Sequence, residues 1–102
     1  GSGVGANATG RNGLSPLLMA AANGHATTVQ RLLAEGATAN ATGAFGNTAL
    51  IVATRNGHAP VVKLLLAAGA NRQLRNSDGN SATDIAGALG HAELEALLRS
   101  GG

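Results

Sequence analysis

GNTALIVATRNGHAPVVKLLLAAGA, at residues 46–70, is the stretch of sequence that decides the fold of this chain. The Gly-His-Ala at its centre, residues 57–59, occurs also at residues 24–26 and 90–92, each time at an interval of 33 residues. Other small and apolar residues keep the same interval: Gly13, Gly46 and Gly79; Ala20, Ala53 and Ala86; Leu32, Leu65 and Leu98. A fixed period of this length predicts a stack of structural repeats in which each unit packs on its neighbours.

Each unit is predicted to hold two short helices and a long loop. In the middle unit a stretch rich in Gly and Asn, residues 42–47, indicates a turn. Thr48 follows as the N-cap of a first helix, which is expected to end at Gly57. A second helix has Pro60 in its first turn, where a missing N–H costs nothing, and is expected to end at Gly69. Such a helix pair cannot bury its apolar face alone, so the units must stack.

The repeated stretch resembles the ankyrin repeat, whose family signature runs roughly G-x-T-P-L-H-x-A-A-x-x-G-H-x-x-V-V-x-L-L-L-x-x-G-A. The resemblance covers residues 7–99, in three units. It implies an all-α solenoid of stacked helix-turn-helix units with hairpin-like loops. The histidine of the family's T-P-L-H turn is replaced by Leu18, Ile51 and Asp84. The hydrogen bonds that this histidine makes between neighbouring units are therefore expected to be missing.

The length of the chain fits one domain. It has 102 residues, enough for a modest hydrophobic core without disulfides or metals. The predicted boundaries are an expression scar and lead-in at 1–6, a first repeat at 7–39, a second at 40–72 and a third at 73–102. Residues 3–10 resemble residues 36–43, the tail of a unit, which leaves open that the chain was cut from a longer array.

The outer units differ from the middle one on the faces that a further neighbour would cover. In their second helices, polar residues stand where the middle unit has Val or Leu: Thr28 and Arg31 in the first unit, Glu95 and Arg99 in the third. Polar outer faces keep the ends of an open stack soluble. The first unit is thus predicted to act as an N-terminal cap and the third as a C-terminal cap.

Composition argues against a catalytic, metal or nucleic-acid site. There is no cysteine, and His25, His58 and His91 occupy equivalent positions in layers about 8–10 Å apart, too far to share one zinc ion. Ser15 and Ser81 are interpreted as helix caps rather than nucleophiles. The net charge is only +2, without a basic run that would bind phosphates. We expect no catalysis, no cofactor, no metal and no nucleic acid; no apolar run is long enough for a membrane span, and the localisation is left open.

The resemblance implies a module that binds another protein. In ankyrin arrays, partners are held on a concave face formed by the hairpin tips and the exposed side of the first helices. Carried over position by position, the resemblance implies these contact residues: Arg11, Asn12, Leu14, Asn23, Thr42, Ala44, Phe45, Asn47, Arg55, Asn56, Arg75, Ser77, Asp78, Asn80 and Leu89.

Phe45 stands out among these residues because it is the only aromatic residue of the chain. Its equivalents, Asn12 and Asp78, are polar, and aromatic residues are common anchors of binding energy. The alternative is that its ring folds back over its own hairpin or packs on a neighbouring tip. Three arginines are expected on the same face: Arg11, Arg55 and Arg75. Together they predict a mildly basic strip and a partner of acidic character.

Two other functions stay open beside protein binding. One is an engineered or excised scaffold with no native partner; the other is the regulatory module of an enzyme. The tip pairs differ between units, whereas strict consensus design would make them alike: Arg11-Asn12, Ala44-Phe45 and Ser77-Asp78. This difference favours a natural sequence. A monomer is expected, with weak self-association through the apolar tips.

Overall fold

The computed structural model of the chain describes residues 16–40 and 42–100. This part of the chain forms a series of short helices: α1 (Pro16–Ala22), α2 (Ala26–Ala34), the 3-10 turn η2 (Ala44–Gly46), α3 (Ala49–Arg55), α4 (Ala59–Ala67), α5 (Ala82–Leu89) and α6 (Ala92–Ser100). None of these helices is long and apolar enough to cross a membrane.

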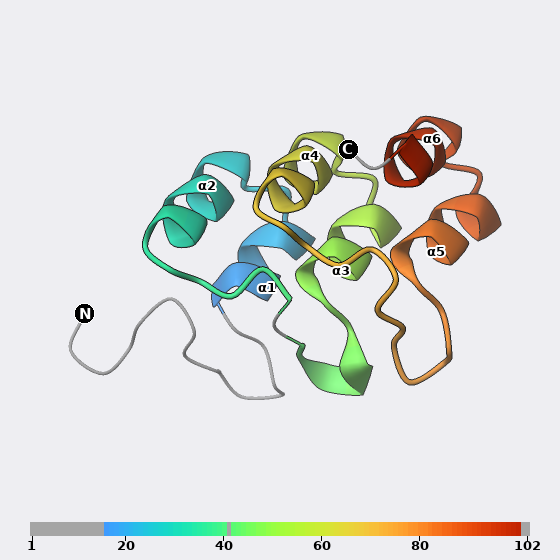
Figure 1. Cartoon of the computed structure of the whole chain (residues 1–102), viewed down its shortest axis with the longest axis horizontal. Helices are drawn as coiled ribbons and strands as arrows, with labels where there is room; N and C mark the ends of the chain where they lie inside the picture. Colours follow the sequence, from blue (N-terminus) through green and yellow to red (C-terminus); the bar gives the residue numbers. More distant parts are fainter. Residues whose placement is uncertain (1–15, 41, 101–102) are drawn as a thin grey trace.

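The helices lie in two layers (Figure 1). The inner layer contains α1, α3 and α5, and each of these helices packs on the next one. The outer layer contains α2, α4 and α6, each packed on the inner helix that precedes it in the chain. The loops before α3 and α5 extend beyond the inner layer (Figure 1). This is the stacked all-α architecture that the period and the resemblance predict.

The helix ends follow the predicted local signals. The Oγ1 of Thr48 caps α3 by accepting a hydrogen bond from the N–H of Ile51, at 3.1 Å. Gly57 follows the C-cap of α3 with φ of 77°, a left-handed conformation that glycine adopts without a Cβ clash. Pro60 is the second residue of α4, where its missing N–H leaves no bond unmade. These three predictions are confirmed.

The core consists of small and aliphatic side chains. They are buried where the inner helices pack on one another and on the outer helices. The periodic alanines, Ala20, Ala53 and Ala86, are all buried. Their short side chains let the inner helices approach closely, which explains a composition rich in alanine. Leu18 and Ile51, which replace the histidine of the family signature, are also fully buried in this core. Apolar packing therefore stands where the signature has a polar side chain.

Hydrogen bonds still connect neighbouring units, through residues that the sequence analysis did not assign to this role. The Nδ2 of Asn56 donates to the carbonyl oxygen of Ala22 at 2.8 Å. The Nε2 of His58 lies 3.1 Å from the same oxygen, which accepts from the ring tautomer protonated there. The expectation that such bonds are missing holds only for the T-P-L-H position. The first and middle units are joined by other side chains.

The polar substitutions on the outer units lie where the sequence analysis expects them. Thr28 and Arg31 of α2 are exposed, as is Arg99 of α6. Glu95 of α6 is half-buried, and the counterparts of Thr28 and Glu95 in α4, Val61 and Val62, are fully buried. The unit boundaries and the capping role of the outer units stay predictions.

Candidate functional site

Two loops contain most of the predicted contact residues: the middle hairpin at residues 42–48 and the third hairpin at residues 75–81. An equivalent backbone hydrogen bond shapes each of them. In the middle hairpin the N–H of Gly43 donates to the carbonyl of Asn47 at 2.9 Å. In the third hairpin the N–H of Asn76 donates to the carbonyl of Asn80 at 3.0 Å, one period further on. The sequence period is thus reproduced in the hydrogen bonds of the loops.

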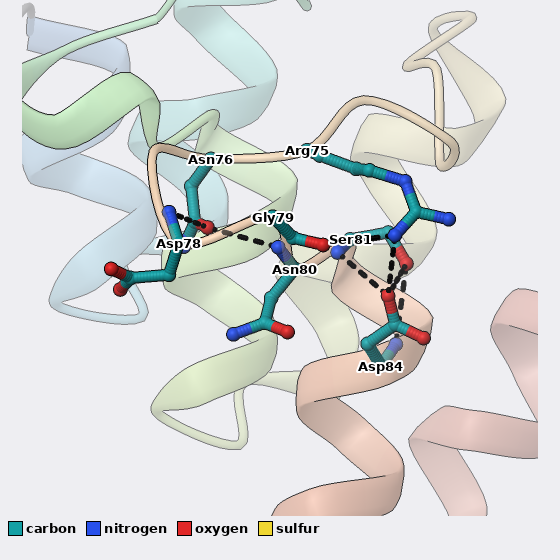
Figure 2. Close-up of polar contacts among 7 residues, drawn as sticks. All are labelled: Arg75, Asn76, Asp78, Gly79, Asn80, Ser81 and Asp84. Carbon is teal, nitrogen blue, oxygen red and sulfur yellow. Dashed lines mark hydrogen bonds and ion pairs between the residues drawn. The ribbon is translucent and has the colours of Figure 1, made fainter.

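Asn76 organises the third hairpin from inside (Figure 2). Its side chain is only 8% exposed. The Oδ1 atom accepts from the N–H of Asp78 at 2.9 Å and from that of Asn80 at 3.1 Å. The Nδ2 atom donates to the Oδ1 of Asn47 in the middle hairpin at 3.0 Å. One buried amide therefore shapes a loop and ties it to its neighbour.

Two further bonds extend this network. The N–H of Ser77 donates to the carbonyl of Phe45 at 2.8 Å, which joins the two hairpin tips. The Oδ1 of Asn47 also accepts from the guanidinium of Arg55 at 3.3 Å. The two hairpins and the end of α3 are thus held as one hydrogen-bonded surface.

A small groove lies where this surface meets α5, and we call it the inner groove. It has a volume of about 210 Å³ and is lined by Arg55, Asn76, Asp78, Asn80, Ile85, Ala88 and Leu89. Its apolar part comes from α5, through Ile85, Ala88 and Leu89. The guanidinium of Arg55 and the carboxylate of Asp78 stand among the polar lining residues. The groove combines an apolar floor with one cation and one anion.

The apolar floor of the inner groove includes a leucine that stands where the middle unit has an asparagine. Leu89 lies one period after Asn56, whose side chain donates to the preceding unit. A leucine cannot donate, and the side chain of Leu89 is 52% exposed. At this position the third unit has an apolar surface instead of a hydrogen bond to the preceding unit.

Phe45 occupies the tip of the middle hairpin in an unfavourable backbone conformation. Its φ of 59° and ψ of 23° are left-handed, and it is the only non-glycine residue with positive φ in the described part of the chain. Such a conformation costs a residue with a Cβ about 1–2 kcal/mol. The residue is 77% exposed, so the ring does not fold back over its own hairpin. The hairpin tip thus presents an exposed aromatic side chain on a backbone conformation that lowers stability.

The comparisons with known proteins agree with this geometry. A family model for ankyrin repeats, in three copies, matches residues 17–101. The chain belongs to the ankyrin repeat family. Ankyrin repeats generally mediate protein–protein interaction, and the family is typically non-enzymatic. A search of curated proteins finds no match to the chain.

The inner groove of this ankyrin array contains four of the predicted contact residues: Arg55, Asp78, Asn80 and Leu89. Others are exposed outside its lining: Asn23, Thr42, Phe45 and Ser77. Asn47 is half-buried in the network between the hairpins, and Asn56 is held by the carbonyl of Ala22. Ala44 begins η2. Arg11, Asn12 and Leu14 lie outside the described residues.

Arg75 is not among the lining residues of the inner groove, and its place in a basic strip stays a prediction. Its guanidinium donates to the carbonyl of Gly79 at 2.9 Å and lies 3.5 Å from a carboxylate oxygen of Asp84 (Figure 2). It lines a different hollow of the ankyrin array. Among the described arginines predicted for this face, Arg55 alone lines the inner groove, and Asp78 lines the same groove.

Asp84 and Ser81 form a capping box at the start of α5. The N–H and the hydroxyl of Ser81 donate to the same carboxylate oxygen of Asp84, at 3.1 and 3.0 Å. The bond from the Ser81 backbone lowers the pKa of Asp84 most, followed by the bond from the Ser81 hydroxyl and by the charges of Arg75 and Arg99. Ser81 is a helix cap, as predicted.

Some residues of the ankyrin array escaped the sequence analysis. Ile85 lines the inner groove although it is only 7% exposed, and Met19 on α1 is 50% exposed. Met19 and Ile85 hold the same position in their units and are apolar, which by pattern alone indicates core. The role of Asn76 could have been predicted from the sequence. An Asn in a turn often accepts a hydrogen bond from the backbone N–H two residues on, here that of Asp78, and so forms an Asx turn.

Proposed function

We propose that this ankyrin array binds another protein through the inner groove and the neighbouring tip of the middle hairpin, without catalysis. The observation that carries the proposal is the composition of the groove, an apolar floor with a cation and an anion beside it. Its volume of about 210 Å³ is below the range of about 300–1,000 Å³ usual for small-molecule sites. The groove suits one inserted side chain of a protein partner.

The charges beside the floor define the chemistry of that partner. Arg55 suits a carboxylate placed next to an apolar side chain of the partner. Asp78 suits an amide or a cation on the other side. The acidic character proposed for the partner is therefore local, confined to the group that meets Arg55, and does not extend to its overall charge.

The hydrogen bonds between the hairpins favour tight binding. Asn76 and Asn47 connect the two loops before any partner arrives. Loops that are already ordered lose little conformational freedom when they bind, which leaves more of the interaction energy for affinity. A rigid, preformed surface is the mechanism that we propose.

The experiment is a selection of binders from a displayed library of protein fragments of the source organism, followed by affinity measurements on variants. Leu89→Asn is the central variant, because it places in the third unit the residue that the middle unit has at Asn56. The fold should therefore tolerate it, which circular dichroism and thermal melting would check. Removing the apolar floor is expected to weaken binding at least about tenfold, as for an interface hot spot.

The control is Lys63→Gln on α4, which changes an exposed charge in the outer layer. It is expected to leave the affinity unchanged. Binders that retain full affinity for the folded Leu89→Asn variant, or that lose it with Lys63→Gln, would show that the inner groove is not the binding surface.

A further inference from the structure

A second hollow of the molecule is larger than the inner groove and differs from it in chemistry. It has a volume of about 420 Å³ and is lined by Arg72, Gln73, Arg75, Ser81, Thr83, Leu98 and Arg99. We call it the arginine hollow. It lies between the loop before the third hairpin, the start of α5 and the end of α6, and no residue that the structure describes lines both this hollow and the inner groove.

Three guanidinium groups reach this hollow from different segments. Arg75 lies 3.5 Å from Asp84, and Arg99 lies 3.0 Å from Glu95, so each forms one ion pair. Arg72 is half-buried and has no hydrogen-bond or ion-pair partner among residues 16–40 and 42–100. The three arginines and two acids leave an excess of one positive charge, and none of the described residues that line the hollow is acidic.

Two of the three arginines act on the start of α5. The charges of Arg75 and Arg99 both lower the pKa of Asp84 in its first turn, which shows that both act at this point. Thr83 offers a hydroxyl donor from the same turn. An anion in the hollow would meet donors from three segments of the chain.

We propose that the arginine hollow binds a phosphomonoester, with Arg72 and Arg99 as its main contacts. A phosphomonoester carries close to two negative charges and has three strong acceptor oxygens. The planar guanidinium fork can pair with two of these oxygens at once. The volume of the hollow leaves room for the group that bears the phosphate. The site is separate from the inner groove and independent of the function proposed for it.

The first experiment is an NMR titration of the ¹⁵N-labelled protein with O-phosphoserine, and separately with inorganic phosphate, at an ionic strength held constant with sodium chloride. Saturable shifts of the Nε–H signals of Arg72 and Arg99 and of the Thr83 amide are expected. Tighter binding of phosphoserine would indicate a phosphorylated side chain as the ligand, and equal binding a site for the phosphate group alone. Shifts that grow linearly with concentration, or that chloride reproduces, would overturn the proposal.

Two variants with opposite expected effects sharpen the test. Arg72→Gln should weaken phosphoserine binding about tenfold, because a charge-assisted contact is lost, whereas Arg31→Gln, on exposed α2, should leave it unchanged. Asp84→Asn should strengthen binding about fivefold, because it removes a negative charge near the hollow and keeps an oxygen acceptor for Ser81. A gain of affinity cannot result from a damaged fold. Equal losses in Arg72→Gln and Arg31→Gln, or weaker binding by Asp84→Asn, would contradict a phosphate site.

Discussion

Gly24 and Gly57 offer a matched pair of substitutions that tests how neighbouring units are joined. Both follow an inner helix and precede His-Ala, and their φ values are 73° and 77°. They differ in what a Cβ would meet. At Gly24 it would lie 2.7 Å from the imidazole of His58, whereas at Gly57 the nearest atom, on His91, is 3.6 Å away.

The structure assigns different costs to the two alanine variants. In both, a left-handed residue with a Cβ costs about 1 kcal/mol. In Gly24→Ala the imidazole of His58 must also move, which breaks its bond to the Ala22 carbonyl for about another 1 kcal/mol. Repacking the displaced ring adds about 1 kcal/mol. We expect a loss of about 3 kcal/mol in the free energy of unfolding for Gly24→Ala and about 1 kcal/mol for Gly57→Ala.

Urea denaturation followed by circular dichroism measures both losses, provided that the slope with urea is the same in each variant. A double-mutant cycle isolates the clash, because in the His58→Ala background the Gly24→Ala substitution should cost only the backbone term. The expected coupling is about 2 kcal/mol. Equal losses for Gly24→Ala and Gly57→Ala, with no coupling to His58, would refute the reasoning that close approach of this histidine joins the units.

Three further predictions concern single residues. Phe45→Asn should raise the free energy of unfolding by about 0.5–1 kcal/mol in urea titrations, because Asn tolerates a left-handed backbone better than Phe does; a loss of stability would contradict the strain. Thr54→Val should stabilise by about 1 kcal/mol on the same measurement, since the buried hydroxyl of Thr54 has no hydrogen-bond partner in the described part of the chain; a Val variant that is less stable would show that the hydroxyl is satisfied. Asp84, whose folded-state pKa is lowered by Ser81 and Arg75, contributes stability that is present above its ordinary pKa of 3.8 and is lost as the pH falls through the lowered value. Urea midpoints between pH 6 and pH 2 should therefore fall less steeply for Asp84→Asn than for the unsubstituted chain, and parallel curves would argue against this contribution.

Most of the architecture could be predicted from the sequence, because in a repeat array the local signals recur. Thr48 caps α3 and Gly57 takes a left-handed conformation for reasons contained in their own segments. The same local signals are repeated at an interval of 33 residues, so each unit supports the interpretation of the others. The all-α stack follows from that period.

The details of the site could not be predicted, because they depend on contacts between units. Arg75 lies at the base of a hairpin, but its direction is set by the carboxylate of Asp84 and the carbonyl of Gly79. Asn76 acts through a partner 29 residues away in the middle hairpin. A period describes what the units share, whereas these contacts arise where the units differ.

The inner groove itself is a consequence of such a difference. At Asn56 the repeat position holds a donor that joins the middle unit to the carbonyl of Ala22. At Leu89, one period later, the donor is gone and the side chain is half-exposed beside Ile85. A hydrogen bond between units contributes about 1 kcal/mol to stability, whereas a half-exposed leucine gains only part of its burial energy in the isolated array. A partner that covers Leu89 would add the rest of that energy, which is about 1.5–3 kcal/mol for a full side chain. The third unit thus lacks a hydrogen bond within the array at the position where it exposes an apolar surface.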